Sequence, residues 1–348
     1  MRVLIIKTSS MGDIIHTLPA LTDAGKAVPG IRFDWVVEEN FAEIPGWHPL
    51  VENVVPVAIR RWRKNIFAAR THREVRKLYS LLRAAQYDLI IDAQGLFKSL
   101  WIAGIAKGPL CGLDRHSARE PLTSLFYSRK YSACWDWHAV TRLRSLFSQA
   151  LHYPFVENAA DYGIDRKIFR DHQDQPEASK YLVFLHGTTW ATKHWPEKYW
   201  MELAGIANEK GWHIKLPWGN EEEKKRALRI AVACENACVL PRLNLIEITK
   251  ILAEAEAVVA VDTGLAHLAA ALNVPTVSVY GSTDAVLTGT LGESQIHLSA
   301  KFSCAPCLSR ECTYRGAEKD LANPACFSTV SPMQVWNALI SFNELYKT

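Results

Sequence analysis

The sequence predicts an α/β protein with two Rossmann-like domains, whose parallel sheets face a central cleft. Three observations support this fold class. The chain has 348 residues, which is enough for about two domains of ~100–200 residues each. Short β-branched runs alternate with amphipathic stretches in both halves, as in βαβ units. A polar, proline-containing segment without hydrophobic period, residues 171–177, separates the halves and is the predicted linker.

The first predicted domain, residues 1–170, opens on a buried strand at 3–6. Further strands follow at 33–37, 54–57 and 88–92, with helices at about 14–26 and 73–85. The strand at 54–57 is the weakest, because Pro56 has no N–H for a ladder.

The second predicted domain, residues 178–330, repeats the pattern. We expect strands at 181–185, 213–216, 257–261 and 276–280, and helices at 198–210, 221–232 and 264–272. Gly211 would end the first of these helices. A last helix, at about 332–346 within a C-terminal segment 331–348, is expected to pack back on the first domain.

Composition excludes several classes of protein. The chain is 49% hydrophobic and 22% charged, which argues against disorder. No apolar run approaches the ~18 residues of a membrane span. The apolar run Val3–Ile6 is too short for a signal peptide, so we expect a cytoplasmic chain. A net charge of +4 is too mild to predict nucleic-acid binding.

Basic residues are concentrated between positions 60 and 83, where nine stand against one acid, Glu74. Such a cluster attracts anions or an anionic surface. After Arg70 a solvated helix face explains the charges equally well. We interpret the tight block Arg60, Arg61, Arg63 and Lys64 as functional.

Four of the eight cysteines lie close together near the C-terminus: Cys304, Cys307, Cys312 and Cys326. Structural zinc is one hypothesis for them, although the second C-x2-C of a zinc ribbon is missing. Plain thiols or a redox-sensitive pair are the alternatives.

Two loops follow predicted strands where ligands bind in parallel sheets, at the carboxyl ends. The loop 7–13 offers Ser9, Ser10, Gly12 and Asp13. It matches neither the G-x-G-x-x-G dinucleotide fingerprint nor a P-loop. Asp13 fits a helix N-cap or a general base.

The second loop, 262–267, combines Asp262, Thr263, Gly264 and His267 at a helix start, which favours phosphate binding. Three neighbouring segments add candidate ligands. They supply the hydroxyls of Thr188 and Thr189, the cation Lys193, one of Glu221, Glu222 or Glu223 for ribose, and apolar Leu243 for a base.

Three motifs together resemble the bacterial lipopolysaccharide heptosyltransferases of glycosyltransferase family 9. They are Gly12-Asp13 with Pro19, Lys193-x-Trp195-Pro196, and Asp262-Thr263-Gly264-x-x-His267. The resemblance runs from Met1 to about Asp284. The segments 57–64 and 118–122 favour the member that acts on Kdo over its paralogues.

This resemblance implies a GT-B fold and an inverting, metal-independent glycosyltransferase without cofactor. The donor would be ADP-L-glycero-β-D-manno-heptose and the acceptor the inner Kdo of Kdo2-lipid A, reached at the cytoplasmic face of the inner membrane by peripheral contact through the basic patch. Asp13 would be the base. The donor would be held by Thr188, Thr189, Lys193, Glu223, Leu243, Asp262, Thr263, Gly264 and His267. The acceptor would be held by Ser9, Ser10, Gly12, Arg60, Arg61, Arg63, Lys64 and Arg119.

Three other functions stay open at this point. A later core heptosyltransferase would use the same donor with a heptosyl acceptor. A Rossmann-type oxidoreductase is disfavoured by the missing glycine fingerprint. A non-enzymatic nucleotide-sugar or lipid A binding module would carry the same loops without turnover.

Overall fold

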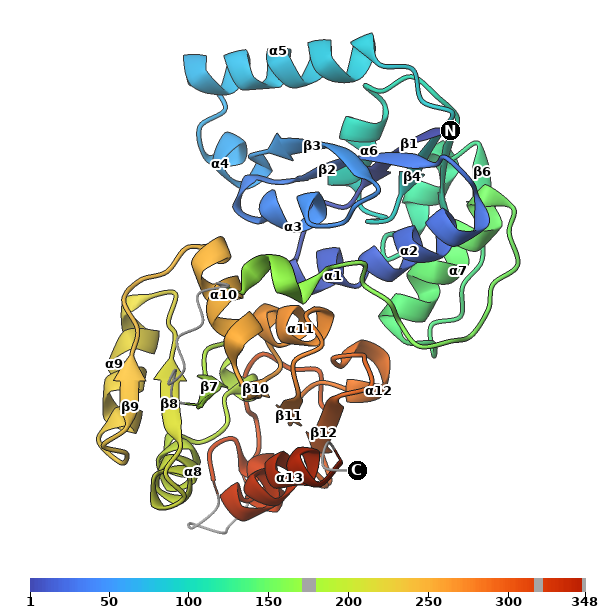
Figure 1. Cartoon of the computed structure of the whole chain (residues 1–348). Helices are drawn as coiled ribbons and strands as arrows, with labels where there is room; N and C mark the ends of the chain where they lie inside the picture. The colour runs from blue at the N-terminus through green and yellow to red at the C-terminus, as the bar shows by residue number, and fades with distance from the viewer. Residues whose placement is uncertain (171–179, 316–321, 346–348) are drawn as a thin grey trace. The chain divides into compact units, whose positions relative to one another are not determined.

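The computed structural model describes residues 1–170, 180–315 and 322–345. The chain divides into two compact units, Met1–Ile164 and Asp165–Thr348 (Figure 1). The predicted linker at 171–177 lies outside the described residues. The segment just before it belongs to the second unit, because Arg166 Nε donates to the Ala253 carbonyl at 2.6 Å.

The first unit contains a six-stranded sheet in the order β3-β2-β1-β4-β5-β6, with every pair parallel. Val3 stands opposite Phe33 on one side and Leu89 on the other. The strands are β1 (Arg2–Ile6), β2 (Arg32–Glu38), β3 (Val51–Val57), β4 (Leu89–Asp92), β5 (Leu110–Leu113) and β6 (Arg129–Tyr131). Pro56 is tolerated because β3 is an edge strand.

Helices cover both faces of this sheet because its buried strands are apolar on both sides (Figure 1). Leu4 and Ile6 face a core with Leu78 of α5 and Ile102 of α6. On the other face α2 packs against α7. The helices are α1 (Met11–Ile15), α2 (Leu18–Ala27), α3 (Glu43–Gly46), α4 (Ile59–Lys64), α5 (Ala69–Ala84), α6 (Phe97–Ala103) and α7 (Ala139–Leu151), with short 3-10 turns η1 (Glu39–Phe41) and η2 (Pro121–Phe126).

The second unit repeats this topology with the order β12-β11-β10-β7-β8-β9, again all parallel. When the strands are numbered from the first strand of each unit, and the second sheet is read from β9 to β12, both sheets have the Rossmann order 3-2-1-4-5-6. The strands are β7 (Tyr181–Leu185), β8 (His213–Leu216), β9 (Ala237–Val239), β10 (Ala257–Val261), β11 (Thr276–Tyr280) and β12 (Gln295–Ser299).

The core of the second unit is built around Trp195 and Trp200, which meet edge to face with ring centroids 5.1 Å apart. The C-terminal helix contributes Val335, Trp336 and Leu339 to this same core. The helices are α8 (Glu197–Glu209), α9 (Glu221–Ala231), α10 (Leu245–Glu254), α11 (Gly264–Ala271), α12 (Ala285–Thr288) and α13 (Pro332–Leu345), with 3-10 turns η3 (Arg166–Phe169), η4 (Ala191–Lys193) and η5 (Ala325–Thr329).

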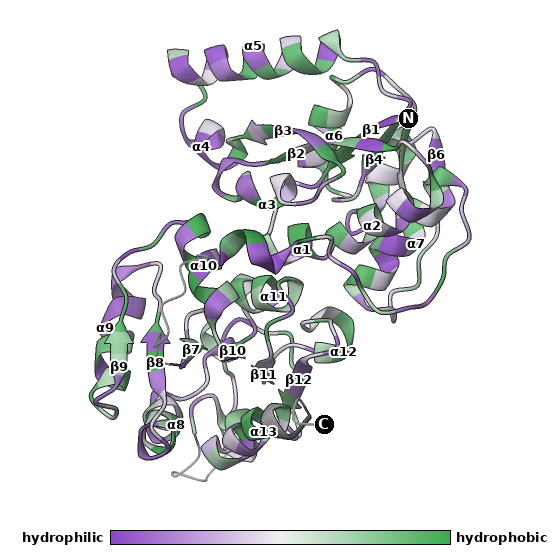
Figure 2. Ribbon diagram, in the orientation of Figure 1, coloured by the Kyte–Doolittle hydropathy of each residue, from purple (hydrophilic) through white to green (hydrophobic). Residues whose placement is uncertain are grey.

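The two Rossmann-like, parallel-sheet units confirm the predicted fold class. One predicted helix is wrong, because 14–26 is two helices that break at His16 and Thr17. Pro19 lies in the first turn of α2, where its missing N–H costs nothing. Hydrophilic and hydrophobic bands alternate along α5, and its buried side chains are Thr71, Leu78 and Leu82 (Figure 2).

Among the helices of the described chain, none combines the length and the apolar character needed to cross a bilayer.

Candidate active site

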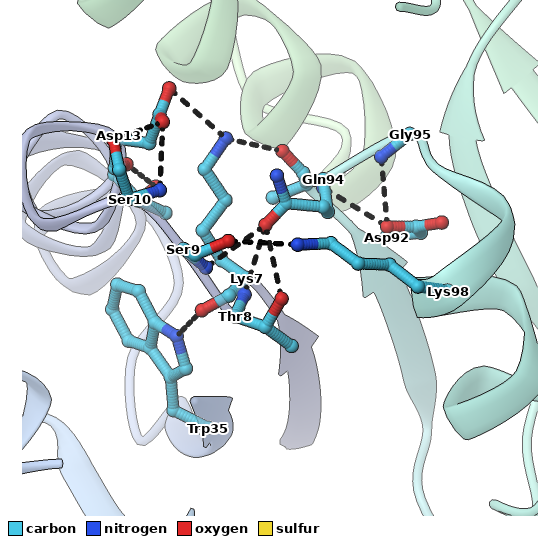
Figure 3. Close-up of polar contacts among 12 residues, drawn as sticks. Lys7, Thr8, Ser9, Ser10, Asp13, Trp35, Asp92, Gln94, Gly95 and Lys98 are labelled. Atoms are coloured by element: carbon cyan, nitrogen blue, oxygen red, sulfur yellow. Dashed lines mark hydrogen bonds and ion pairs between the residues drawn. The ribbon is translucent and has the colours of Figure 1, made fainter. Parts of the chain in front are cut away.

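The first polar cluster forms where the loops after β1 and β4 meet at the switch point of the first sheet. Gln94 Oε1 accepts from the backbone N–H of Thr8 at 3.0 Å and of Ser9 at 3.2 Å (Figure 3). The Lys7 carbonyl accepts from Trp35 Nε1 at 3.1 Å. These bonds hold the loop 7–10 in one conformation although it lies outside any helix or strand.

Asp13 and Lys7 form the charged centre of this loop. Asp13 Oδ2 accepts from the Ser10 N–H at 2.8 Å and from Ser10 Oγ at 2.7 Å, which is a capping arrangement at the start of α1. Asp13 Oδ1 lies 4.0 Å from Lys7 Nζ, and Lys7 also donates to the Ala93 carbonyl at 3.0 Å. Burial alone would raise the pKa of Asp13, but Lys7 and the Ser10 bonds outweigh it and hold the pKa at about 2. The side chain is half-buried and ionised at neutral pH.

Asp92 fixes the neighbouring loop from inside the sheet. Its Oδ1 accepts from the N–H groups of Gln94 at 3.0 Å and Gly95 at 3.1 Å. Its Oδ2 accepts from Ser99 Oγ at 2.9 Å and the Tyr127 hydroxyl at 2.8 Å. Burial raises the pKa of Asp92, and these four donors favour its charged form.

Lys98 is a cation that the sequence analysis missed. Its Nζ donates to Ser9 Oγ at 2.8 Å (Figure 3). Burial is the main reason why the pKa of Lys98 is lowered, and the charges of Arg60 and Arg119 add to it. Arg60 and Arg119, which are both predicted acceptor ligands, therefore lie near the loop that holds Ser9 and Asp13. No motif marks Lys98, and only its position after β4, the strand next to β1, points to this loop.

The basic block divides into two kinds of residue. Arg60, Arg63 and Lys64 are exposed and form no ion pair with any residue that the structure describes. Arg61 instead bridges Glu39, at 2.9 Å, and Glu74, at 3.0 Å. Its guanidinium therefore fastens α4 to its neighbours in addition to contributing positive charge. Gly12 is buried within α1 and lies at the same loop.

The second polar cluster occupies the equivalent switch point in the second unit, between the loops after β7 and β10. Thr188 Oγ1 donates to the Asp262 carbonyl at 3.0 Å. Lys193 Nζ pairs with Asp262 Oδ2 at 2.7 Å, with side chains only 17% and 9% exposed. The structure thus brings together residues that lie 74 positions apart in the sequence.

Asp262 is the hub of this cluster. Thr283, which the sequence analysis missed, donates to its Oδ2 at 2.7 Å, and His267 Nε2 lies 3.9 Å from its Oδ1. Burial raises the pKa of Asp262, but His267 and Lys193 outweigh it, so the net pKa is well below its ordinary value. A buried carboxylate with this many partners stays ionised.

Thr263 and Gly264 follow directly, as the cap and first residue of α11. Both are half-buried, and the Thr263 side chain makes no capping bond. Free N–H groups at such a helix start, with Lys193 beside it, suit an anion such as a phosphate. Thr189 is exposed at the end of the neighbouring loop.

Of the three glutamates in a row, Glu223 contacts the loops after β7 and β8. Its Oε2 accepts from the Gly219 N–H at 2.7 Å, and a Cβ on Gly187 would stand 2.7 Å from its carboxyl carbon. Glu222 instead pairs with Lys225 on the surface. A side chain at position 187 would therefore displace the Glu223 carboxylate from its place.

Leu243 is half-buried in the loop after β9. Trp218, after β8, contacts the start of this loop, because its Nε1 donates to the Leu240 carbonyl at 2.7 Å. These apolar groups extend the row of strand-end ligands from β10 across β7 and β8 to β9.

The cysteine-bearing segment contacts the loops after β11 and β7, which the sequence did not indicate. Leu308 N–H donates to the Ser282 carbonyl at 2.8 Å, and Thr192 Oγ1 donates to the Ser309 carbonyl. Arg310 and Lys193 both lie over the Trp190 ring, at 5.4 and 4.6 Å. Arg310 is therefore a second cation beside the Lys193 cluster.

The four C-terminal thiols do not form a metal site in this structure. The charges of Cys304, Cys307 and Cys312 add to burial in raising the pKa of Cys326 to about 11, so the four lie in one region. Yet no three His, Cys, Asp or Glu side chains of the described chain are gathered closely enough to hold a metal ion. The zinc hypothesis therefore gains no support from the described residues.

Comparison with known proteins identifies the family. Glycosyltransferase family 9 (heptosyltransferase) matches residues 75–318. The chain belongs to this family. It is therefore a glycosyltransferase, and the oxidoreductase alternative is wrong.

Several family 9 heptosyltransferases are similar over nearly their whole length. Lipopolysaccharide heptosyltransferase 1 of Pseudomonas aeruginosa is 56% identical over 343 residues, 96% of each chain. The structure of Escherichia coli heptosyltransferase WaaC with ADP is 46% identical, covers 99% of both chains and superposes with a TM-score of 0.84. The same E. coli protein with ADP-2-deoxy-2-fluoro heptose covers 99% of this chain and 100% of that one, at 45% identity and a TM-score of 0.82. Lipooligosaccharide heptosyltransferase 2 of Haemophilus ducreyi is only 24% identical, over 85% of this chain and 88% of its own.

Proposed function

We propose that this family 9 heptosyltransferase transfers L-glycero-D-manno-heptose from ADP-heptose to the inner Kdo of Kdo2-lipid A, with inversion and without a metal ion. The reaction builds the inner core of lipopolysaccharide. The roles below are assigned from the contacts within each unit.

The donor binds at the strand ends of the second unit. Lys193, Thr188, Thr189 and the N–H groups at Thr263 and Gly264 hold the diphosphate. Glu223 accepts from the ribose hydroxyls, and Leu243 lines the adenine pocket beside Trp218. Asp262 and His267 contact the heptose side of the donor, and Arg310 adds positive charge near the diphosphate.

These groups stabilise the transition state more than the ground state. ADP is the leaving group, so negative charge grows on its β-phosphate as the glycosidic bond breaks. The Lys193 ammonium and the free N–H groups of α11 are already oriented toward an anion, and they strengthen their interaction as that charge develops.

Asp13 is the general base. It takes the proton of the attacking Kdo hydroxyl as that oxygen bonds to the anomeric carbon on the face opposite ADP, which inverts the configuration. The low pKa of Asp13 keeps the carboxylate unprotonated at neutral pH, which is the form that a base requires, while the geometry of the bound acceptor directs the proton to it. A positioned base typically contributes a factor of ~10²–10⁴.

The acceptor binds at the loops of the first unit. Kdo and lipid A carry carboxylates and phosphates, which suit Arg60, Arg63, Lys64 and Arg119. Arg61 supports the block, and Ser9, Ser10 and Gly12 contact the sugar at the loop 7–13. Because this acceptor resides in a membrane, the enzyme works as a peripheral protein at the cytoplasmic face of the inner membrane.

The inner Kdo is favoured over a heptosyl acceptor by the difference in identity between the relatives. The Pseudomonas aeruginosa protein named heptosyltransferase 1 is 56% identical, against 24% for the Haemophilus ducreyi protein named heptosyltransferase 2. The basic block also suits an acceptor site close to the anionic lipid A.

The observation that carries the proposal is the ionised Asp13 fixed beside Lys7, in a chain 56% identical to a heptosyltransferase 1. The decisive experiment supplies ADP-heptose with Kdo2-lipid A, and separately with the already heptosylated acceptor. ADP release with the first acceptor alone is expected. Release with the second alone would establish the later transfer, and no release with either would leave a binding protein.

A further inference from the structure

The turn η2 has its polarity inverted. Its polar residues Thr123 and Ser124 are buried, while Leu122, Leu125 and Phe126 are 61%, 70% and 62% exposed. Leu122 and Leu125 are three residues apart, so a 3-10 turn places them on one side. Apolar side chains on the outside of a short turn are unfavourable in water, which indicates that an apolar environment outside the chain covers them.

Helix α6 extends this apolar surface. Phe97 and Trp101 are each 49% exposed and lie four residues apart, on one face of the helix. The helix packs beside η2, and the Phe97 N–H donates to Glu120 Oε2, just before η2, at 2.7 Å. We call the five exposed side chains of α6 and η2 the apolar patch: Phe97, Trp101, Leu122, Leu125 and Phe126.

Cations border the apolar patch on the side of the acceptor loop. Lys98 lies within α6 and donates to Ser9 Oγ. Arg119 directly precedes η2, is exposed, and lies close enough for its charge to act on Lys98. Glu120 N–H donates to the Gly95 carbonyl at 3.2 Å, which joins the patch to the loop after β4.

An anionic lipid surface fits both properties of this region. Aromatic and aliphatic side chains enter the boundary between headgroups and acyl chains, while adjacent Lys and Arg pair with lipid phosphates. A second copy of the chain would bury the apolar side chains but would bring the same cations together, which costs energy.

We propose that the apolar patch inserts into the surface of an anionic bilayer and so holds the loop 7–13 at the height of the acceptor's sugars. This inference rests on the proposed membrane-borne acceptor. The apolar patch would add a second component to membrane binding besides charge attraction. Salt would not weaken this component, because ions do not screen the burial of apolar surface.

The test compares the wild type with Leu125→Ser/Phe126→Ser, a double variant whose changed side chains are mostly exposed, so stability is expected to change little. Binding is measured by co-sedimentation with phosphatidylcholine vesicles that contain about one third phosphatidylglycerol. We expect the double variant to bind about tenfold or more weakly, and the wild type to retain part of its binding in about 0.5 M salt. Leu228→Ser changes a leucine on α9 of the second unit that is 51% exposed; it is the control and should bind as the wild type does.

Activity separates this inference from the proposed function. With a fully deacylated, water-soluble Kdo2-lipid A fragment, the double variant should match the wild type. With acceptor embedded in vesicles its rate should fall severalfold. Equal vesicle binding by wild type and double variant would overturn the inference, as would a change of oligomeric state in the variant without loss of vesicle binding. Failure of the wild type to release ADP from the soluble fragment would instead refute the proposed function.

Discussion

The Lys193–Asp262 pair supports a prediction in which stability and donor binding separate. Lys193→Met removes the ammonium but keeps the aliphatic stem. At 2.7 Å the bare attraction is about 6 kcal/mol for an effective dielectric constant of 20, and desolvation of both ions offsets much of it. Loss of one partner from a buried pair costs about 3–5 kcal/mol. Thr283 and His267 still contact Asp262, so we expect the lower end, about 3 kcal/mol.

The pH dependence of this loss follows from the lowered pKa of Asp262. The pKa of Asp262 is lower in the folded protein than in the unfolded chain, where it is about 4, so the ionised carboxylate stabilises the fold at pH values above about 4. This contribution disappears as the pH falls through the pKa of the folded state. The wild type and the variant should therefore differ most at neutral pH and converge in acid. Urea denaturation of the two proteins at several pH values measures this difference.

Donor binding should weaken for a second, independent reason. A hydrogen bond to a charged group contributes about 1.5–3 kcal/mol, which predicts about 10–150-fold weaker ADP binding by calorimetry. The double variant Lys193→Met/Asp262→Asn should regain most of the stability but none of the affinity. Lys198→Met, on the exposed face of α8, is the matched control. The assignment is refuted if the single variant loses stability yet binds ADP within twofold of the wild type.

Three other substitutions test the remaining roles. Asp13→Asn should lower kcat by about 10²–10⁴ while ADP-heptose affinity changes little, and wild-type turnover would exclude Asp13 as the base. Arg60→Ala/Arg63→Ala should raise the acceptor KM, most strongly at low salt, because salt at higher concentration screens these exposed cations. An unchanged KM at low salt would contradict their role in acceptor binding. Glu223→Gln should raise the donor KM while Glu222→Gln does not, and equal effects would remove the ribose assignment.

The sequence predicted the strands nearest each switch point and the edge strand β3, and it missed β5, β6, β9 and β12, each of which lies at a sheet edge or next to one. The runs at 3–6 and 257–261 are continuous and β-branched, which is typical of strands buried on both faces. By contrast β5 contains Cys111-Gly112, and β6 is the three-residue segment Arg129–Tyr131. Such short strands carry no periodicity, and tertiary pairing alone makes them strands.

The sequence predicted those residues of the candidate site that stand in a motif. It did not predict those that only the folding of the chain brings into the site. Asp13 and Lys193 stand in recognisable motifs. Lys98 and Arg310 do not, because each enters its cluster through a neighbour distant in sequence: Ser9 for Lys98 and Trp190 for Arg310. Likewise the sequence left three glutamates equivalent, and the contacts with Gly219 and Gly187 distinguish Glu223.

The shared strand order also governs when each binding loop can form. The bonds from Thr8 to Gln94 and from Thr188 to Asp262 span 86 and 74 residues, and both join the loop after a first strand to the loop after a fourth. During synthesis neither loop can adopt its final conformation until the fourth strand of its unit has emerged and docked, so ligand binding reports a nearly finished fold. If ADP binds the second unit as proposed, it should raise the unfolding temperature of that unit first, and thereby reveal whether the two units unfold as one cooperative body or as two.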